Sequence, residues 1–320
     1  MPATPLGSRG TGSQGHGLWS AKNPSYGATF SLYLKGVDQS LKSKRQKKEK
    51  ELEKNGEAVF YPSFEEIRAE DLEEKAQLIW QIFDGEGNEI RRMKSAPSKG
   101  IVRQTWDLRT NNTNPIGSGG SGFLVTPGEY MVSVVYLKDG KSDLLIDKQK
   151  FTIKGLNNQT LIAQNPEELK TFRAEVAELN RQVSGTEKVM KETKEKVDII
   201  EKALLGYPNT DLNLMESIRN MKVTYKDLEV MMWGDNARSS RDFETVPSIS
   251  GRLGMVGYQL YQNTTGVTNT HRSNKNIAEK QYKELKSKLN QIISYLDAVE
   301  KKLDGVIPYT KDKGDDWKED

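Results

Sequence analysis

The front half of the chain alternates hydrophobic and polar residues with a period of two, as half-buried β-strands do. The first such segment runs from Ala28 to Leu34 and predicts a strand. Further predicted strands are Ala76–Phe83, Glu89–Met93, Ile101–Leu108, Gly128–Leu137 and Leu145–Ile153. Glycine and Asx residues between Asp84 and Asn88 predict a hairpin turn. Short strands at this spacing are typical of an antiparallel β-sandwich.

A charged stretch interrupts this pattern after the first strand. From Gly36 to Lys75 the chain consists mainly of Lys, Glu, Arg and Gln, and Tyr61-Pro62-Ser63 breaks the run. The pattern predicts two charged helical arms on either side of a proline turn. Residues 36–75 are therefore expected to form a helical insertion within the sandwich.

The back half changes to hydrophobic steps of three and four residues, the spacing of a helical seam. In the segment Pro166–Leu205 the seam is Leu169, Phe172, Val176, Leu179, Val183, Thr186, Met190, Thr193, Val197, Ile200 and Leu204. The spacing recurs in Leu214, Ile218, Met221, Tyr225, Leu228 and Met232, in Ile249, Leu253, Val256 and Leu260, and in Ala278, Tyr282, Leu285, Leu289, Ile292, Leu296, Val299 and Leu303. Glycine and proline separate these segments, so an antiparallel, heptad-patterned helical bundle is expected.

The composition excludes several kinds of chemistry. Lys plus Arg (48) and Asp plus Glu (45) nearly cancel, so no overall field favours nucleic acid or an anionic membrane. The chain has no cysteine and two histidines, His16 and His271, so a histidine triad or a typical zinc site is hard to build. No segment reaches the length of about 18 apolar residues that a membrane span needs.

One stretch near the start carries a resemblance to a known family. Gly15 to Phe30 includes Trp19 and Asn23-Pro24-Ser25-Tyr26-Gly27, and it continues into Tyr33-Leu34-Lys35. It resembles the exit from the β-propeller in bacterial sortilin-like proteins of the BNR-repeat kind, which are often labelled glycosyl hydrolases.

The resemblance continues over most of the chain. Tyr61-Pro62-Ser63 and Arg68-Ala69-Glu70 lie where the family has a similar charged insertion. The sandwich resembles a FlgD-like immunoglobulin-like domain at Ile82-Phe83-Asp84, Gly87, Ile90-Arg91-Arg92, Trp106-Asp107-Leu108-Arg109 and Pro127-Gly128-Glu129-Tyr130. The helical half resembles the family's C-terminal bundle at Gln182-Val183-Ser184-Gly185 and Pro247-Ser248-Ile249.

The resemblance implies an organisation and a location. Residues 1–18 would be a linker or truncated propeller exit, 19–155 the Ig-like sandwich, 166–307 the helical bundle and 308–320 a disordered tail. The propeller of the same full-length protein would be the partner, and related proteins look exported, to the periplasm or cell surface. No propeller repeats lie within this chain, so a propeller's site is not assigned to residues here.

Carboxylates and basic residues in the insertion admit two interpretations. A glycoside hydrolase needs two carboxylates about 5 to 10 Å apart, one of them with a raised pKa. Glu65, Glu66, Glu70, Asp71, Glu73 and Glu74 could supply them, but a charged helix exposed to water is favoured. Lys42–Lys50 could neutralise phosphates, yet Glu49, Glu51 and Glu53 favour a salt-bridged helix with pairs such as Lys47 and Glu51.

Four further features each admit a functional and a structural interpretation. Trp106, Asp107 and Arg109 could contact a sugar, although a core tryptophan at a strand end is favoured. The segment 111–122 could hold Ca²⁺, although a loop without a site is favoured. His271 is expected to cap a helix or lie on the surface. Thr186 and Thr193 are expected to bond back to helix carbonyls rather than form a crevice.

The sequence therefore predicts an α+β multidomain chain with no catalytic, metal or cofactor residues. The expected function is a non-catalytic structural module of a sortilin-like propeller protein. Two alternatives stay open: part of a glycoside hydrolase, or a module that binds carbohydrate or a cell-surface partner.

Overall fold

The computed structural model describes residues 24–114, 120–156, 165–206, 208 and 210–303. These residues combine antiparallel sheets with helices, so the mixed α+β class is confirmed. They separate into two compact units, one from residues 1–111 and 124–158, the other from 112–123 and 159–320. The predicted linker 1–18 and tail 308–320 lie outside the described residues.

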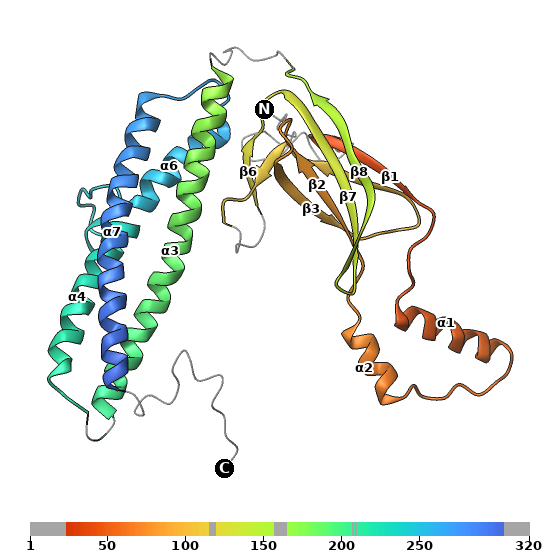
Figure 1. Cartoon of the computed structure of the whole chain (residues 1–320), viewed down its shortest axis with the longest axis horizontal. Helices are drawn as coiled ribbons and strands as arrows, with labels where there is room; N and C mark the ends of the chain where they lie inside the picture. Colours follow the sequence, from red (N-terminus) through yellow and green to blue (C-terminus); the bar gives the residue numbers. More distant parts are fainter. Residues whose placement is uncertain (1–23, 115–119, 157–164, 207, 209, 304–320) are drawn as a thin grey trace, which may run out of the picture. The chain divides into compact units, whose positions relative to one another are not determined.

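The first unit contains two antiparallel sheets (Figure 1). In the smaller sheet β1 (Ala28–Leu34) pairs with β4 (Gly100–Trp106). The larger sheet has the order β3 (Glu89–Ser95), β2 (Gln77–Phe83), β7 (Gly128–Lys138) and β8 (Lys141–Ile153). The chain also forms the short strands β5 (Arg109–Asn111) and β6 (Ser121–Leu124), which the sequence pattern did not predict.

Side chains from both sheets share one hydrophobic core. Leu32, Val102 and Trp106 come from the two-stranded sheet, and they cluster with Trp80 and Tyr130 of the larger sheet. Trp106 and Tyr130 meet edge to face with ring centroids 5.7 Å apart, a favourable aromatic geometry. The hydrophobic positions of the alternating sequence pattern are therefore the ones whose side chains face this core.

Two tight turns connect strands of the larger sheet. The predicted turn at Asp84–Asn88 is confirmed, because Asp84 Oδ1 accepts hydrogen bonds from the backbone N–H groups of Glu86 and Asn88. Asp139 and Gly140 join β7 to β8, and both have positive φ angles (48° and 70°). A two-residue hairpin with positive φ at both positions matches the right-handed twist of the strands.

The second unit is helical. Its elements are α3 (Pro166–Gly206), α4 (Leu214–Trp233), α5 (Asn236–Ser239), α6 (Ile249–Gln262) and α7 (Asn269–Lys302). Every predicted seam residue of α3 is buried except Thr186, which is half-buried. The seams of α4, α6 and α7 are buried at all their predicted positions. The short helix α5 lies between two predicted helices, in a segment for which the sequence pattern predicted no helix.

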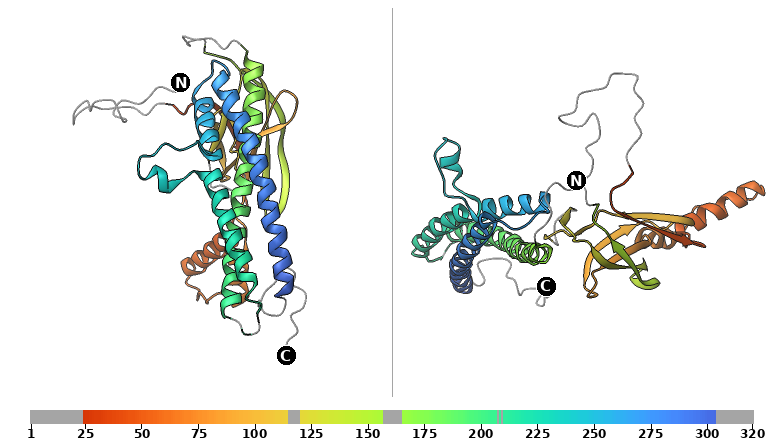
Figure 2. Two further views of the ribbon diagram at one scale, coloured as in Figure 1. Left: turned by 90° about the vertical axis from the view of Figure 1, so that its left-hand side faces the viewer. Right: turned by 90° about the horizontal axis from the view of Figure 1, so that it is seen from above.

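The direction of each helix follows from its ion pairs. Along α3 and α4 the partners run in opposite order, since Lys194 pairs with Glu229 and Glu201 pairs with Lys222. Along α3 and α7 they run in the same order: Glu175 pairs with Lys275, and Lys196 pairs with Asp297. Helix α4 is thus antiparallel to α3, while α3 and α7 are parallel; Figure 2 shows α3, α4 and α7 side by side.

The helices α4 and α6 form one column along α3. Glu187 of α3 accepts hydrogen bonds at the same carboxylate oxygen from Trp233 Nε1 at the end of α4 and from Ser250 Oγ at the start of α6, each at 3.1 Å. The segment 234–248 therefore begins and ends beside Glu187, so the end of α4 and the start of α6 lie close together. This is why four long helices make only three columns.

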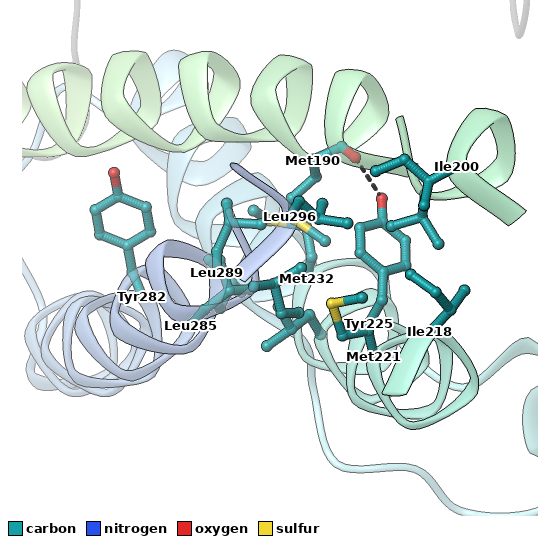
Figure 3. Close-up of a cluster of buried hydrophobic side chains, with 14 of the residues drawn as sticks. Met190, Ile200, Ile218, Met221, Tyr225, Met232, Tyr282, Leu285, Leu289 and Leu296 are labelled. Atoms are coloured by element: carbon teal, nitrogen blue, oxygen red, sulfur yellow. Dashed lines mark hydrogen bonds between the residues drawn. The ribbon is translucent and has the colours of Figure 1, made fainter. Parts of the chain in front are cut away.

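The core of these columns is almost entirely apolar (Figure 3). Tyr225 of α4 brings a polar atom into this core, where its hydroxyl donates to the carbonyl oxygen of Met190 at 2.7 Å. Burial, together with nearby Glu229 and Asp198, raises the pKa of Tyr225 to about 12. The phenol therefore stays protonated and keeps donating at physiological pH.

A second core lies at the other end of the helical unit, where α6 ends. Phe123 belongs to this unit and packs with Leu169, Phe172, Val176, Val256 and Leu260. Arg173 is buried beside it and donates to the carbonyl oxygens of Leu260 and Asn263 at 3.0 and 2.7 Å. The last carbonyl oxygens of a helix have no N–H partner within the helix, and a cation placed there supplies donors for them.

Candidate functional site

The structure brings Trp106, Asp107 and Arg109 together in a turn that ends β4. Trp106 has no exposed surface, and its Nε1 donates to the Arg109 carbonyl at 2.8 Å. Asp107 Oδ1 accepts from the Arg109 backbone N–H at 3.2 Å. A sugar cannot stack on an indole that is fully covered, so the expectation of a core tryptophan fits the structure and the sugar platform does not.

The acidic residues of the insertion lie on or beside α2 (Phe64–Leu72), which has no buried residue. Glu66 closes a capping box with Ser63, and the hydrogen bonds from Ser63 lower the pKa of Glu66. Glu70 makes a two-pronged pair with Arg45, which lowers the pKa of Glu70. A general acid of a glycosidase needs a raised pKa, so these two carboxylates are shifted in the opposite direction.

The basic run Lys42–Lys50 lies on α1 (Leu41–Lys54), which also has no buried residue. Arg45 joins the two helices, because it contacts Glu70 at 2.5 Å and Glu49 of its own helix at 2.6 Å. The i,i+4 ion pair of this helix joins Arg45 and Glu49, a different pair from the Lys47 and Glu51 example that the sequence suggested. Both predicted helical arms of the insertion are confirmed.

The carboxylates after α2 attach the insertion to the β7–β8 turn. Glu73 accepts from the Leu41 N–H at 2.7 Å, at the start of α1, and pairs with Lys138 Nζ at 3.4 Å. Glu74 accepts from the Gly140 N–H at 3.1 Å, and its own N–H donates to Asp139 Oδ1 at 3.2 Å. The two helices are therefore held in place by bonds at their base.

Between the two helices lies a group of exposed aromatic side chains that sequence reasoning did not single out. Phe60, Tyr61 and Phe64 are 83%, 93% and 78% exposed. We call these three residues the aromatic tip, and residues 41–72 the arm. In the sequence, these three aromatic residues fall within five consecutive positions inside a charged stretch, and that grouping could have revealed the cluster. Exposed aromatic clusters mark interaction surfaces.

His271 is buried and serves as a helix cap. Its Nδ1 accepts from the Thr268 N–H at 3.2 Å, while Nε2 lies 2.9 Å from Gln259 Oε1. Burial, and then the charge of Arg272, lower the pKa of His271. The predicted capping role is confirmed, and the predicted surface placement is wrong because the ring is 3% exposed.

The remaining candidates are structural or lie partly outside the described residues. Thr186 and Thr193 donate to the carbonyl oxygens of Gln182 and Val189, as expected for hydroxyls within a helix. Of the loop 111–122, residues 115–119 lie outside the described residues. Within the described ranges no three His, Asp or Glu side chains gather as metal ligands would.

Comparison with protein-family models, with curated proteins and with solved structures gave no match. Among the described residues, no helix combines the length and the apolar character that crossing a membrane requires. The arm, with its aromatic tip, is the feature of the first unit that core packing does not explain, and it is the candidate functional site.

Proposed function

We propose that this chain is a non-catalytic assembly module of an exported, sortilin-like propeller protein. Its first unit would be an Ig-like, FlgD-like sandwich, and its second unit a helical bundle that braces or extends the assembly. The observation that carries the proposal is the structural use of the candidate residues: Glu66 closes a helix cap, Glu70 and Glu73 form ion pairs, and Trp106 lies in the core.

Three features of the first unit support an Ig-like fold. The order β3-β2-β7-β8 opposite β1-β4 matches a four-stranded sheet facing a smaller one. Trp80 is buried on β2, at the centre of the larger sheet, as the core tryptophan of such domains is. At the start of β7, Tyr130 donates its hydroxyl to the Thr126 carbonyl at 2.6 Å, the arrangement of a tyrosine corner.

The arm supports an assembly role for this module. Its helices bury nothing, yet ion pairs, a capping box and bonds to the β7–β8 turn fix them. A rigid charged hairpin with aromatic residues at its end is suited to contact another surface, because little conformational entropy is lost on binding.

Two experiments test the proposal. The chain and its Glu65→Gln/Glu70→Gln variant are assayed on 4-nitrophenyl glycosides. We expect no hydrolysis above the buffer rate, and hydrolysis that falls in the variant would overturn the non-catalytic assignment.

In the second experiment, the open reading frame upstream of this sequence is determined, and any propeller that it encodes is co-expressed with this chain. Mutual protection from proteolysis supports the assembly role, and independent digestion of both parts contradicts it.

A further inference from the structure

The charge on the arm is divided between its two helices. The helix α1 carries seven basic and three acidic side chains, whereas α2 carries one basic and four acidic ones. Arg45 and Glu70 neutralise each other within the arm. Exposed charges of opposite sign remain on the two helices, such as Lys47 and Lys48 on α1 and Glu65 and Asp71 on α2.

We infer that the arm is a self-association surface whose partner is the arm of a second copy of this chain. In a two-fold arrangement the basic α1 of one copy lies against the acidic α2 of the other, and the reverse contact follows from symmetry. The two aromatic tips are covered in the same contact. This inference rests on the proposed assembly role and names the partner that the arm would take.

Charge complementarity singles out this occupant. One surface that carries both signs is complementary to itself when it is turned by 180°, so a second copy satisfies both helices at once. An anionic membrane would attract α1 but repel Glu65 and Glu66, which directly follow Phe64 of the tip. A nucleic acid would be repelled by α2 in the same way.

The size and preorganisation of the arm are adequate for a dimer of moderate strength. A standard interface uses about 20 to 30 residues on each side. The helices α1 and α2 contain 14 and 9 residues, and Phe60 and Tyr61 of the aromatic tip lie between them. Because Ser63, Glu66, Arg45 and Glu70 already fix the arm, association orders few additional groups.

The test is sedimentation equilibrium of the full chain over a range of concentrations and salt. We expect a monomer–dimer equilibrium that weakens as the salt concentration rises, since the contacts are exposed ion pairs. The double variant Phe60→Ser/Tyr61→Ser should weaken dimerisation at least about tenfold, because exposed aromatic anchors commonly dominate a contact. Both residues bury nothing in the monomer, so its circular dichroism and melting should stay unchanged.

A charge exchange supplies the control. Lys47→Glu/Lys48→Glu on α1 and Glu65→Lys/Asp71→Lys on α2 should each weaken self-association about tenfold. An equimolar mixture of the two variants should restore a dimer, because each altered helix then faces a complementary one. If the variants failed to associate because they were misfolded, mixing them would not restore the dimer.

Three outcomes overturn the inference. They are a monomer at every concentration at low salt, a dimer that neither set of variants weakens, and tip-dependent binding to vesicles with anionic headgroups in place of self-association. Each leaves the proposed structural role standing, because protection by a propeller and the lack of glycoside hydrolysis are measured separately.

Discussion

At the scale of single residues, two tyrosine hydroxyls in the core of the helical unit have hydrogen-bond partners. The hydroxyl of Tyr225 reaches the carbonyl of Met190, and Tyr282 places its hydroxyl 3.0 Å from that of Thr186. An unsatisfied buried polar group would cost about 1 to 3 kcal/mol. These bonds let a core of leucine, isoleucine and methionine include tyrosines without that penalty.

The bond from Tyr225 gives a first prediction. Tyr225→Phe keeps the ring in the core and removes only the hydroxyl, so the free energy of unfolding should fall by about 1 kcal/mol. Urea unfolding followed by circular dichroism at 222 nm measures this. Tyr258→Phe is the matched control, because Tyr258 is 69% exposed and should change stability little. Equal effects of the two changes would contradict the role of the bond.

The buried His271 gives a second prediction, about pH. Its folded pKa is lowered, so below about pH 6.5 the unfolded chain binds more protons than the folded one. Stability contributed by neutral His271 is present above the unfolded pKa and is lost as the pH falls through the folded pKa. The charged group that acts on it is Arg272, which itself pairs with Glu168.

Urea unfolding between pH 7.5 and 5 measures this loss, and a His271→Gln variant should show a flatter dependence on pH. His16→Gln serves as the control, because the chain has two histidines. A His271 pKa at or above about 6.5 by NMR titration of the ring would contradict the prediction.

At the scale of elements, the join between β1 and β4 depends on a glycine just before β1. Gly27 has a φ of 126°, and a Cβ at this position would lie 1.8 Å from the carbonyl oxygen of Trp106. That carbonyl belongs to the end of β4, whose register places Trp106 opposite Ala28. Only glycine permits both the backbone conformation and the close approach.

Gly27→Ala should therefore lower the free energy of unfolding of the first unit by about 1 to 3 kcal/mol. Tryptophan fluorescence during urea unfolding reports it, since Trp80 and Trp106 lie in this core. Gly36→Ala is the control, because no atom lies within 4 Å of a Cβ there. An unchanged midpoint for Gly27→Ala would show that the strand end shifts without cost.

The long periodic elements were predictable because burial alone determines them. The seams of α4, α6 and α7 follow directly from hydrophobic spacing, and so do strands such as β1 and β2. The pattern missed elements that burial does not determine. The helix α5 has four residues and none buried, and β5 has three. Asp139-Gly140 is a turn signal in the sequence, although the strand pattern alone did not predict a turn there.

The candidate site was predicted only in part, for a related reason. The two charged helices of the arm followed from composition and the Tyr61-Pro62-Ser63 break. The aromatic tip did not, since exposed and buried aromatic residues look alike in a sequence without a period. Arg173 was missed because a charged residue beside a seam usually faces water, whereas here it caps the end of α6.

At the scale of the whole molecule, the helical unit includes a segment from the front half of the chain. Residues 112–123 group with it, and Phe123 completes the core formed with Phe172 and Val256. Arg173 lies 6.0 Å from the centre of the Phe123 ring, a cation–π distance. The helices alone therefore lack part of their core.

Phe123→Ala should lower the stability of the helical unit by about 3 kcal/mol, because it removes a buried ring and leaves a cavity. Thermal unfolding followed at 222 nm reports the helices. Phe243→Ala is the control, since Phe243 is 61% exposed in the segment after α5. If both variants melt like the parent chain, Phe123 does not support the helices.

The shared oxygen of Glu187 determines what the segment between α4 and α6 can tolerate. Trp233 and Ser250 both bond to that oxygen, so a carboxylate on α3, and not the length of residues 234–248, sets the gap between the two helices. Doubling the length of such a loop costs about 0.6 kcal/mol of closure entropy. We therefore expect a peptide or a domain inserted into residues 234–248 to leave the spacing of α4 and α6 unchanged.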